Sequence, residues 1–204
     1  MDLNDHRRSR RGPSRPVTRA ALVLSLLAGA ASAAADDPFG QLMRQLAERP
    51  HGHAAFVERQ FVSLLKQPVE SSGELFFDAP DHLEKRTLLP RPESLVVDKG
   101  MLTIQRGARH YSVALRTYPQ MGPFIDSIRA TLAGDRAALE SVYGIDFELT
   151  DHGWVLTLTP RDPKLAAVVR NIRIVGSGDL IQSVETTRAD GDRSVMNITA
   201  LAGS

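Results

Sequence analysis

The chain has 204 residues, of which 42% are hydrophobic and 24% are charged, a balance typical of one ordinary globular domain. It contains no Cys, which excludes a disulfide framework, a thiolate metal site, a Cys nucleophile and the lipid-bearing cysteine of a lipoprotein. Residues 1–33 hold six Arg and two Asp, so the remainder carries 19 basic and 22 acidic side chains. Its net charge of −3 argues against nucleic acid as a partner.

The first 33 residues have the three regions of a secretory signal. An Arg-rich stretch ends at Arg19, a run of about a dozen apolar residues follows, and Ala31-Ser32-Ala33 is a small-residue cleavage motif. The apolar run is too short to span a bilayer comfortably, and no later run reaches about 18 apolar residues. We therefore expect residues 1–33 to be a cleaved signal peptide and residues 34–204 to be a single domain in the periplasm. An uncleaved membrane anchor is the alternative.

A helix is predicted at the start of the mature chain. Asp37 can cap it and Pro38 suits its first position, and apolar residues then recur at helical spacing until Pro50. His51-Gly52-His53 follows as a predicted loop. Two His without a third ligand nearby make a poor metal site, so we expect no metal and no cofactor.

The sequence from residue 54 to residue 115 changes to a period of two. A long strand is predicted over residues 54–65, a turn over residues 68–72, and then three strands separated at Pro80, Pro90 and Gly100. Gly100 stands where a hairpin turn of three to five residues needs a left-handed backbone. A further strand over residues 110–115 extends the antiparallel meander.

Two helices are predicted next, over residues 120–135 and 136–143. Apolar side chains on the first helix form one stripe: Phe124, Ile125, Ile128 and Leu132. Such a stripe fits a helix that packs on the core of a sheet, and it fits equally a lid that closes a cavity. The spacing alone favours neither.

Strands return in the last third of the chain, over residues 145–150, 154–159, 168–175, 180–188 and 194–201. Asp151-His152-Gly153 and Asp190-Gly191 are typical hairpin turns, and residues 160–164 are a predicted loop. The prediction thus amounts to ten or eleven strands with two or three helices. An antiparallel sheet of this size tends to curl or close.

No stretch carries a catalytic signature. Gly176-Ser177-Gly178 lacks the third Gly and the following helix of a dinucleotide site, and neither a phosphate loop nor a Gly-x-Ser-x-Gly elbow is present. Charged runs such as Glu84-Lys85-Arg86 are expected on the solvated face of a strand. We therefore do not expect an enzyme.

A curved sheet with one apolar face can shelter acyl chains without any catalytic residue, because each methylene that leaves water contributes about 0.8 kcal/mol. Alternation within the predicted strands assigns nine residues to that face. The residues predicted to bind lipid are Leu75, Phe77, Leu95, Val97, Leu102, Ile104, Trp154, Leu156 and Leu158.

A family resemblance is carried by spaced residues in the first half of the chain. They are Phe56 with Gln60-Phe61, Gly73-Glu-Leu-Phe-Phe-Asp-Ala-Pro80, Leu83-Glu-Lys-Arg86, and Leu95-Val-Val-Asp-x-Gly100-x-Leu-Thr-Ile104. This pattern resembles the periplasmic outer-membrane lipoprotein carrier family, the LolA-like proteins, and the similarity spans roughly Phe39 to Ile198.

The resemblance implies an α+β fold: a strongly curved antiparallel sheet forming an incomplete β-barrel of about 11 strands with a helical lid. It also implies a periplasmic carrier that shelters the acyl chains of a lipoprotein, between an inner-membrane donor and an outer-membrane acceptor. We expect the carrier to be a monomer. In that family an Arg before Pro80 latches the lid, whereas this chain has Ala79. Because this chain lacks that Arg, an alternative stays open: the protein is a LolA-related carrier or sensor of another lipid, such as a glycolipid or a polyene-type product.

Overall fold

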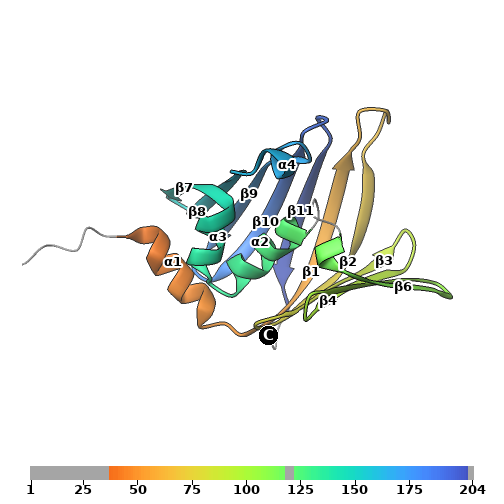
Figure 1. Cartoon of the computed structure of the whole chain (residues 1–204), viewed down its shortest axis with the longest axis horizontal. Coiled ribbons are helices and arrows are strands. Elements are labelled where there is room, and N and C mark those ends of the chain that lie inside the picture. Colours follow the sequence, from red (N-terminus) through yellow and green to blue (C-terminus); the bar gives the residue numbers. More distant parts are fainter. Residues whose placement is uncertain (1–36, 118–121, 202–204) are drawn as a thin grey trace, which may run out of the picture. The chain divides into compact units, whose positions relative to one another are not determined.

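Eleven strands form one antiparallel sheet in the computed structural model, which describes residues 37–117 and 122–201 (Figure 1). The first six are β1 (His51–Phe61), β2 (Val69–Asp78), β3 (His82–Leu89), β4 (Glu93–Asp98), β5 (Met101–Arg106) and β6 (Arg109–Ala114). The other five are β7 (Tyr143–Thr150), β8 (Gly153–Pro160), β9 (Val169–Ser177), β10 (Leu180–Arg188) and β11 (Arg193–Ala200). The predicted signal peptide and the side chains of Pro123 and Phe124 lie outside the described residues.

The sheet is not closed. Its strands follow the order β6-β5-β4-β3-β2-β1-β11-β10-β9-β8-β7, so β6 and β7 are its edges within the described residues. Every neighbouring pair is antiparallel, with β1 and β11 joining the first and second halves of the chain. The expected fold class is confirmed: an α+β protein whose large antiparallel sheet forms an incomplete barrel.

The described helices are α1 (Pro38–Ala47), α2 (Gly122–Leu132), α3 (Arg136–Val142) and α4 (Pro163–Ala166), with a short 3-10 helix η1 (Leu115–Thr117). Asp37 caps α1, because its carboxylate accepts a hydrogen bond from the Gly40 backbone N–H at 3.0 Å. α4 lies where a loop was predicted. It begins with Asp162 as its cap and Pro163 in its first turn, the same start signal that α1 has.

Some strand boundaries differ from the prediction. His51 and His53 lie in β1 and not in a loop, because they pair with Asp78 and Phe76 of β2. The His53 ring stacks on the Phe76 ring at 4.4 Å between centroids. The predicted turn over residues 68–72 is also mostly strand, since β2 begins at Val69. Polar residues near that start hide the strand from a period-two pattern, and pairing with β1 sets its extent.

The turn between β4 and β5 is tighter than predicted. Asp98 pairs directly with Met101, which leaves only Lys99 and Gly100 in the turn. Both have a left-handed backbone, with φ of 47° and 76°. Two such residues match the twist of an antiparallel hairpin.

Buried apolar side chains form two clusters. The first cluster joins α1, α3 and α4 to β8 and β9 through Leu42, Leu46, Leu139, Leu165, Trp154, Leu156, Leu158, Ile172 and Ile174, among others. The second cluster joins α2 and η1 to β4 and β5 through Val97, Leu102, Leu115 and Ile125. Figure 1 shows the helices gathered on one side of the sheet. We call this side the inner face.

Candidate functional site

All nine residues predicted to bind lipid lie on the inner face. Directly opposite residues of an antiparallel pair point to the same side of a sheet. One row across β2 to β5 is Leu75, Lys85, Leu95 and Ile104, and the next row is Phe77, Leu83, Val97 and Leu102. Six of the nine residues therefore form one contiguous surface.

The same face continues into the second half of the sheet. A row of directly opposite residues runs across six strands: Ser71, Glu58, Met196, Val184, Ile174 and Leu156. Ser71 shares its side of β2 with Leu75, and Leu156 shares its side of β8 with Trp154 and Leu158. These pairings place Trp154, Leu156 and Leu158 on the same side of the sheet as the six predicted residues of β2, β4 and β5.

The two halves of the inner face differ in how they are covered. Leu156 and Leu158 are 0% exposed and Trp154 is 4% exposed, beneath α1, α3 and α4. The Trp154 indole donates a hydrogen bond to the Gly178 carbonyl at 2.9 Å. These three residues are closely packed core in this structure. Leu75, Leu95 and Ile104, at the other end, are only partly buried.

Helix α2 covers the β2–β5 half of the inner face with its N-terminal turn. Ile125 is 8% exposed and belongs to the second cluster with Val97, Leu102 and Leu115. Ile128 and Leu132 are partly buried, and the side chain of Phe124 lies outside the described residues. At its described positions, the stripe is therefore buried or partly buried, and Ile125 packs on the second cluster. Its role as a lid stays a prediction.

An ion pair joins α2 to the turn between β2 and β3. Arg129 Nη1 lies 3.3 Å from Asp81 Oδ1, and Arg129 Nη2 lies 3.7 Å from Asp126 Oδ1 on the same helix. Asp81 is two residues beyond Ala79, the position at which the resemblance implies a latch. Helix and turn are thus connected by a cation on the helix and an anion on the turn.

The opposite side of α2 is connected to the start of β7. Tyr143 is 0% exposed, and its side chain is hydrogen-bonded to Ser127. Burial raises the pKa of Tyr143, and the hydrogen bond to Ser127 only partly opposes this rise. The phenol therefore stays protonated at neutral pH.

A polar cluster interrupts the inner face between the two apolar clusters. Lys85 Nζ donates a hydrogen bond to one carboxylate oxygen of Glu58, and Ser194 Oγ donates to the other. Lys85 Nζ also lies 5.0 Å from the centroid of the Phe56 ring. Glu58 is 6% exposed, so a carboxylate is buried on a face that is otherwise largely apolar, paired with the partly exposed Lys85.

The pKa of Glu58 reflects this environment. Burial alone would raise it, but the Lys85 charge and hydrogen bonds from Lys85, Ser194 and Gln60 outweigh burial and lower it below its ordinary value. The expectation that Glu84-Lys85-Arg86 lies on a solvated face is wrong for Lys85. The sequence does indicate the correct side for Lys85. Residues two positions apart in a strand lie on the same side of the sheet, so Lys85 shares the apolar side with Leu83.

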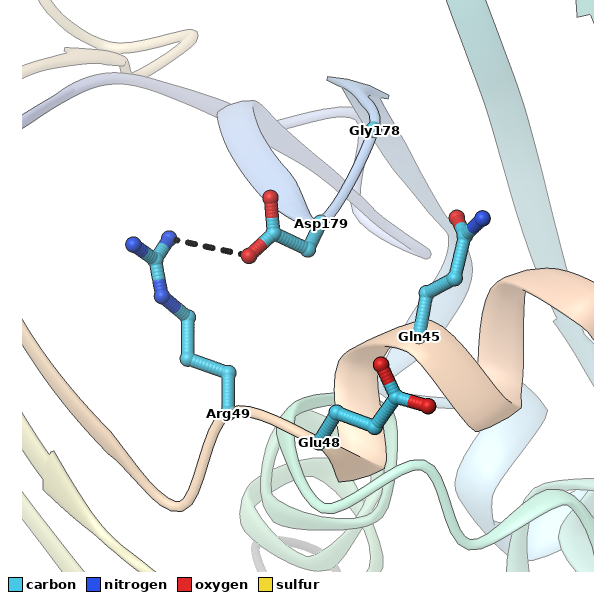
Figure 2. Close-up of a pocket in the computed structure, with 5 residues that line it drawn as sticks. All are labelled: Gln45, Glu48, Arg49, Gly178 and Asp179. Carbon is cyan, nitrogen blue, oxygen red and sulfur yellow. Dashed lines mark ion pairs between the residues drawn. The ribbon is translucent and has the colours of Figure 1, made fainter.

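Two pockets in the described part of the chain lie beside helix ends. The first, shown in Figure 2, has a volume of 430 Å³ and lies between the end of α1 and the β9–β10 turn. Arg49 and Asp179 form an ion pair across it at 3.5 Å, and Gln45, Glu48 and Gly178 complete its lining. This polar lining does not suit an acyl chain.

The second pocket has a volume of 610 Å³ and lies beside the N-terminus of α2. Its lining consists of Lys99, Gly100, Met101, Ala114, Leu115, Arg116, Gly122 and Asp126. Leu115 also belongs to the second cluster. None of the nine predicted residues lines either pocket. The role of these nine residues in lipid binding therefore stays a prediction.

The described residues contain neither a candidate metal-ligand group nor a candidate membrane-spanning helix. Within residues 37–117 and 122–201, no three or more His, Asp or Glu side chains are grouped so as to hold a metal ion. None of the helices described in those ranges combines the length and the apolar character needed to cross a bilayer.

The sequence and the fold were compared with known proteins. No curated protein matches the sequence. A LolA superfamily protein from Nitrosomonas europaea is 10% identical, with a TM-score of 0.44 over 78% of this chain and 90% of that chain. An outer membrane lipoprotein-sorting protein domain from Vibrio parahaemolyticus is 12% identical, with a TM-score of 0.45 over 82% of this chain and 92% of that chain.

The complex of MucA and MucB from Pseudomonas aeruginosa is also similar. The matching chain of that complex is 17% identical, with a TM-score of 0.44 over 81% of this chain and 59% of that chain. A family model matches residues 28–204 and is described as outer membrane lipoprotein carrier protein LolA-like. Since that match covers most of the sequence, the chain belongs to the LolA-like family.

Proposed function

We propose that this protein is a periplasmic carrier that shelters the acyl chains of a lipoprotein on its inner face and delivers the lipoprotein toward the outer membrane. One observation supports the proposal above the others. The nine residues selected by alternation share one face of an unclosed sheet, on the side that the helices cover. Membership of a carrier-like family agrees with the lack of a catalytic signature in the sequence.

The β2–β5 half of the inner face, beside the second cluster, is the better place for an acyl chain. The first cluster is closed, whereas Leu75, Leu95 and Ile104 are only partly buried and retain apolar surface. A 14-carbon chain placed against them gains on the order of 10 kcal/mol from leaving water, before association costs. The pocket beside the N-terminus of α2 shares Leu115 with this region and is the proposed entrance.

Helix α2 is the proposed lid over this half. Its stripe, Phe124, Ile125, Ile128 and Leu132, would move away from the second cluster as cargo enters. The Arg129–Asp81 ion pair is the proposed latch, which takes the place of the Arg that the family resemblance implies at Ala79. Gly134, with φ of 66°, follows the helix and suits the hinge.

The rest of the proposal concerns location and partners. Residues 1–33 would be removed as a signal peptide during export, leaving residues 34–204 in the periplasm. The carrier would receive cargo from an inner-membrane donor, pass it to an outer-membrane acceptor and act as a monomer. It would need no cofactor and no nucleic acid.

The cargo is tested by purifying the mature protein from the periplasm and identifying the bound lipids by mass spectrometry. Acylated lipoprotein in the wild type, and its loss in Leu95→Arg, would support the lipoprotein carrier. Leu149→Arg is the matched control, because Leu149 is 68% exposed on the edge strand β7. A glycolipid or polyene-type product in place of lipoprotein would support the alternative carrier. Purification without any lipid, together with no binding of added acyl ligands, would contradict both.

A further inference from the structure

Lys85 is a cation in the middle of an apolar part of the inner face. It lies directly opposite Leu75 on β2 and Leu95 on β4, and Leu83 precedes it on the same side of β3. Its side chain is 25% exposed, whereas the side chain of its partner Glu58 is 8% exposed. The ammonium group is therefore reachable from the space in front of the sheet, and the carboxylate is enclosed.

The hydrogen bonds of the pair determine what it can still bind. One oxygen of Glu58 accepts from Lys85 and the other from Ser194. A lysine ammonium has three N–H donors, and one of them is used on Glu58. The site therefore offers a donor and a positive charge to a ligand, but little acceptor capacity. It suits an oxygen acceptor and not an amine.

A charged pair in this place is costly as a purely structural device. Packed apolar residues of similar volume often stabilise a protein as well as a buried ion pair does, or better. We infer that Lys85 binds the anionic or carbonyl oxygen at the head of an acyl-bearing ligand, a phosphate, carboxylate or ester group. Glu58 and Ser194 act as positioning residues that hold Lys85 in place.

This inference rests on the proposed function and deepens it, because it divides the ligand between two parts of one face. The apolar side chains on either side of Lys85, Leu75 and Leu95, contact the chain. Lys85 contacts the polar group from which the chain extends. A carrier built in this way selects its cargo by its head group as well as by its apolar chain.

The test compares ligands that share one chain and differ in their head group. Dodecyl phosphate, dodecanoate and dodecanol compete with the neutral fluorophore N-phenyl-1-naphthylamine for the mature protein. The wild type is expected to bind dodecyl phosphate at least about tenfold more tightly than dodecanol, the size of effect that a charge-assisted hydrogen bond gives. Inorganic phosphate alone should not displace the fluorophore.

The variants are chosen to avoid an unpaired buried charge. Glu58→Gln with Lys85→Met removes both charges together, and it should abolish the preference for dodecyl phosphate while leaving dodecanol affinity unchanged. Arg86→Met is the matched control, because Arg86 lies on the outer face of the same strand with a 47% exposed side chain. Circular dichroism melts verify that each variant is folded.

The outcomes separate this inference from the function on which it rests. Equal wild-type affinity for dodecyl phosphate and dodecanol would overturn the role of Lys85 and leave the carrier intact. The role of Lys85 would also be overturned if the folded double variant still preferred dodecyl phosphate, or if inorganic phosphate alone displaced the fluorophore. Failure of every chain-bearing ligand to bind the wild type would overturn the carrier proposal itself.

Discussion

Arg129 of α2 and Asp81 of the β2–β3 turn form an ion pair, with 3.3 Å between Nη1 and Oδ1. The two side chains are 22% and 42% exposed, so solvent screens their attraction. Pairs of this kind contribute less than about 1 kcal/mol to stability. Such a pair is too weak to hold the fold together, but it is strong enough to alter how often a helix leaves a surface.

Asp81→Asn tests this pair as a latch. We expect the melting temperature to change little and acyl-ligand exchange to become several times faster, because about 1 kcal/mol corresponds to roughly a fivefold change in a rate. Stopped-flow displacement of a fluorescent fatty acid measures the exchange. The double variant with Asp81→Arg and Arg129→Asp should restore slow exchange. Unchanged exchange in Asp81→Asn would exclude the latch.

Ala79→Arg makes a related prediction with a definite sign. An arginine at position 79 would stand two residues from Asp81 and compete with Arg129 for its carboxylate. We therefore expect faster cargo exchange in this variant, measured in the same displacement experiment. Slower exchange would mean that the new side chain contacts α2 directly, as the family resemblance implies for an Arg at this position.

Ile128→Ala distinguishes a lid from a core helix. Full burial of Ile128 in a packed core would make its truncation cost about 2–5 kcal/mol. Ile128 is only partly buried, so we expect a smaller loss of stability together with a clear loss of acyl-ligand retention. Thermal melts and exchange rates are measured on the same samples. A large loss of stability with normal exchange would contradict the lid.

The two halves of the inner face should respond differently to truncation. Leu156→Ala removes a side chain that is 0% exposed, so we expect it to cost about 2–5 kcal/mol and to leave affinity per folded molecule unchanged. Ile104→Ala should cost less stability and weaken acyl-ligand binding. Urea unfolding and ligand titration give the two quantities. The reverse pattern would place the binding surface under α1 and α3.

The depressed pKa of Glu58 predicts an acid-dependent loss of stability. Glu58 takes up a proton less readily in the folded state than at its ordinary pKa of 4.5 in the unfolded chain. Its stabilising contribution is therefore complete above about pH 4.5 and is lost as the pH falls through the folded-state pKa. Melting temperatures measured from neutral pH downward should fall less steeply in the variant with Glu58→Gln and Lys85→Met. Parallel curves for the two proteins would contradict this.

The N-terminus of the exported protein tests the proposed processing. Cleavage after Ala33 leaves Ala34 as the first residue, because Ala31-Ser32-Ala33 is the small-residue motif that follows the apolar run. N-terminal sequencing of the periplasmic fraction should find Ala34 or a residue within two positions of it. Recovery of Arg19 in that fraction would show that the segment is retained.

Much of the fold could be predicted because most strands repeat a simple pattern. Leu95 and Val97, or Leu156 and Leu158, alternate with residues of the other face, and a period of two assigns them correctly. The order of the strands could not be obtained in this way. The pairing of β1 with β11 joins residues more than a hundred positions apart, such as Phe56 and Ile198, and no local pattern encodes it.

The candidate site was harder to predict than the fold, because burial depends on what covers a face. Alternation places Trp154 and Ile104 on one surface. Trp154 is a buried core residue only because α1 and α3 cover it, and alternation does not predict where those helices lie. The same holds for charges. In the run Glu84-Lys85-Arg86, the sequence predicts an ordinary surface lysine at position 85. The structure instead places Glu58 of another strand beside Lys85. Arg129 and Asp81 are likewise 48 positions apart in the sequence.

The free edges of the sheet have a consequence for cargo. In a closed barrel the interior diameter is fixed, because the number of strands and their stagger determine the radius. Within the described residues, no backbone pairing joins β6 to β7. The two ends of this sheet can therefore move apart without breaking a single inter-strand hydrogen bond. Under the proposed function, side chains and helices then set the room available to cargo, and molecules with different numbers of chains can be admitted while the backbone pairing stays the same.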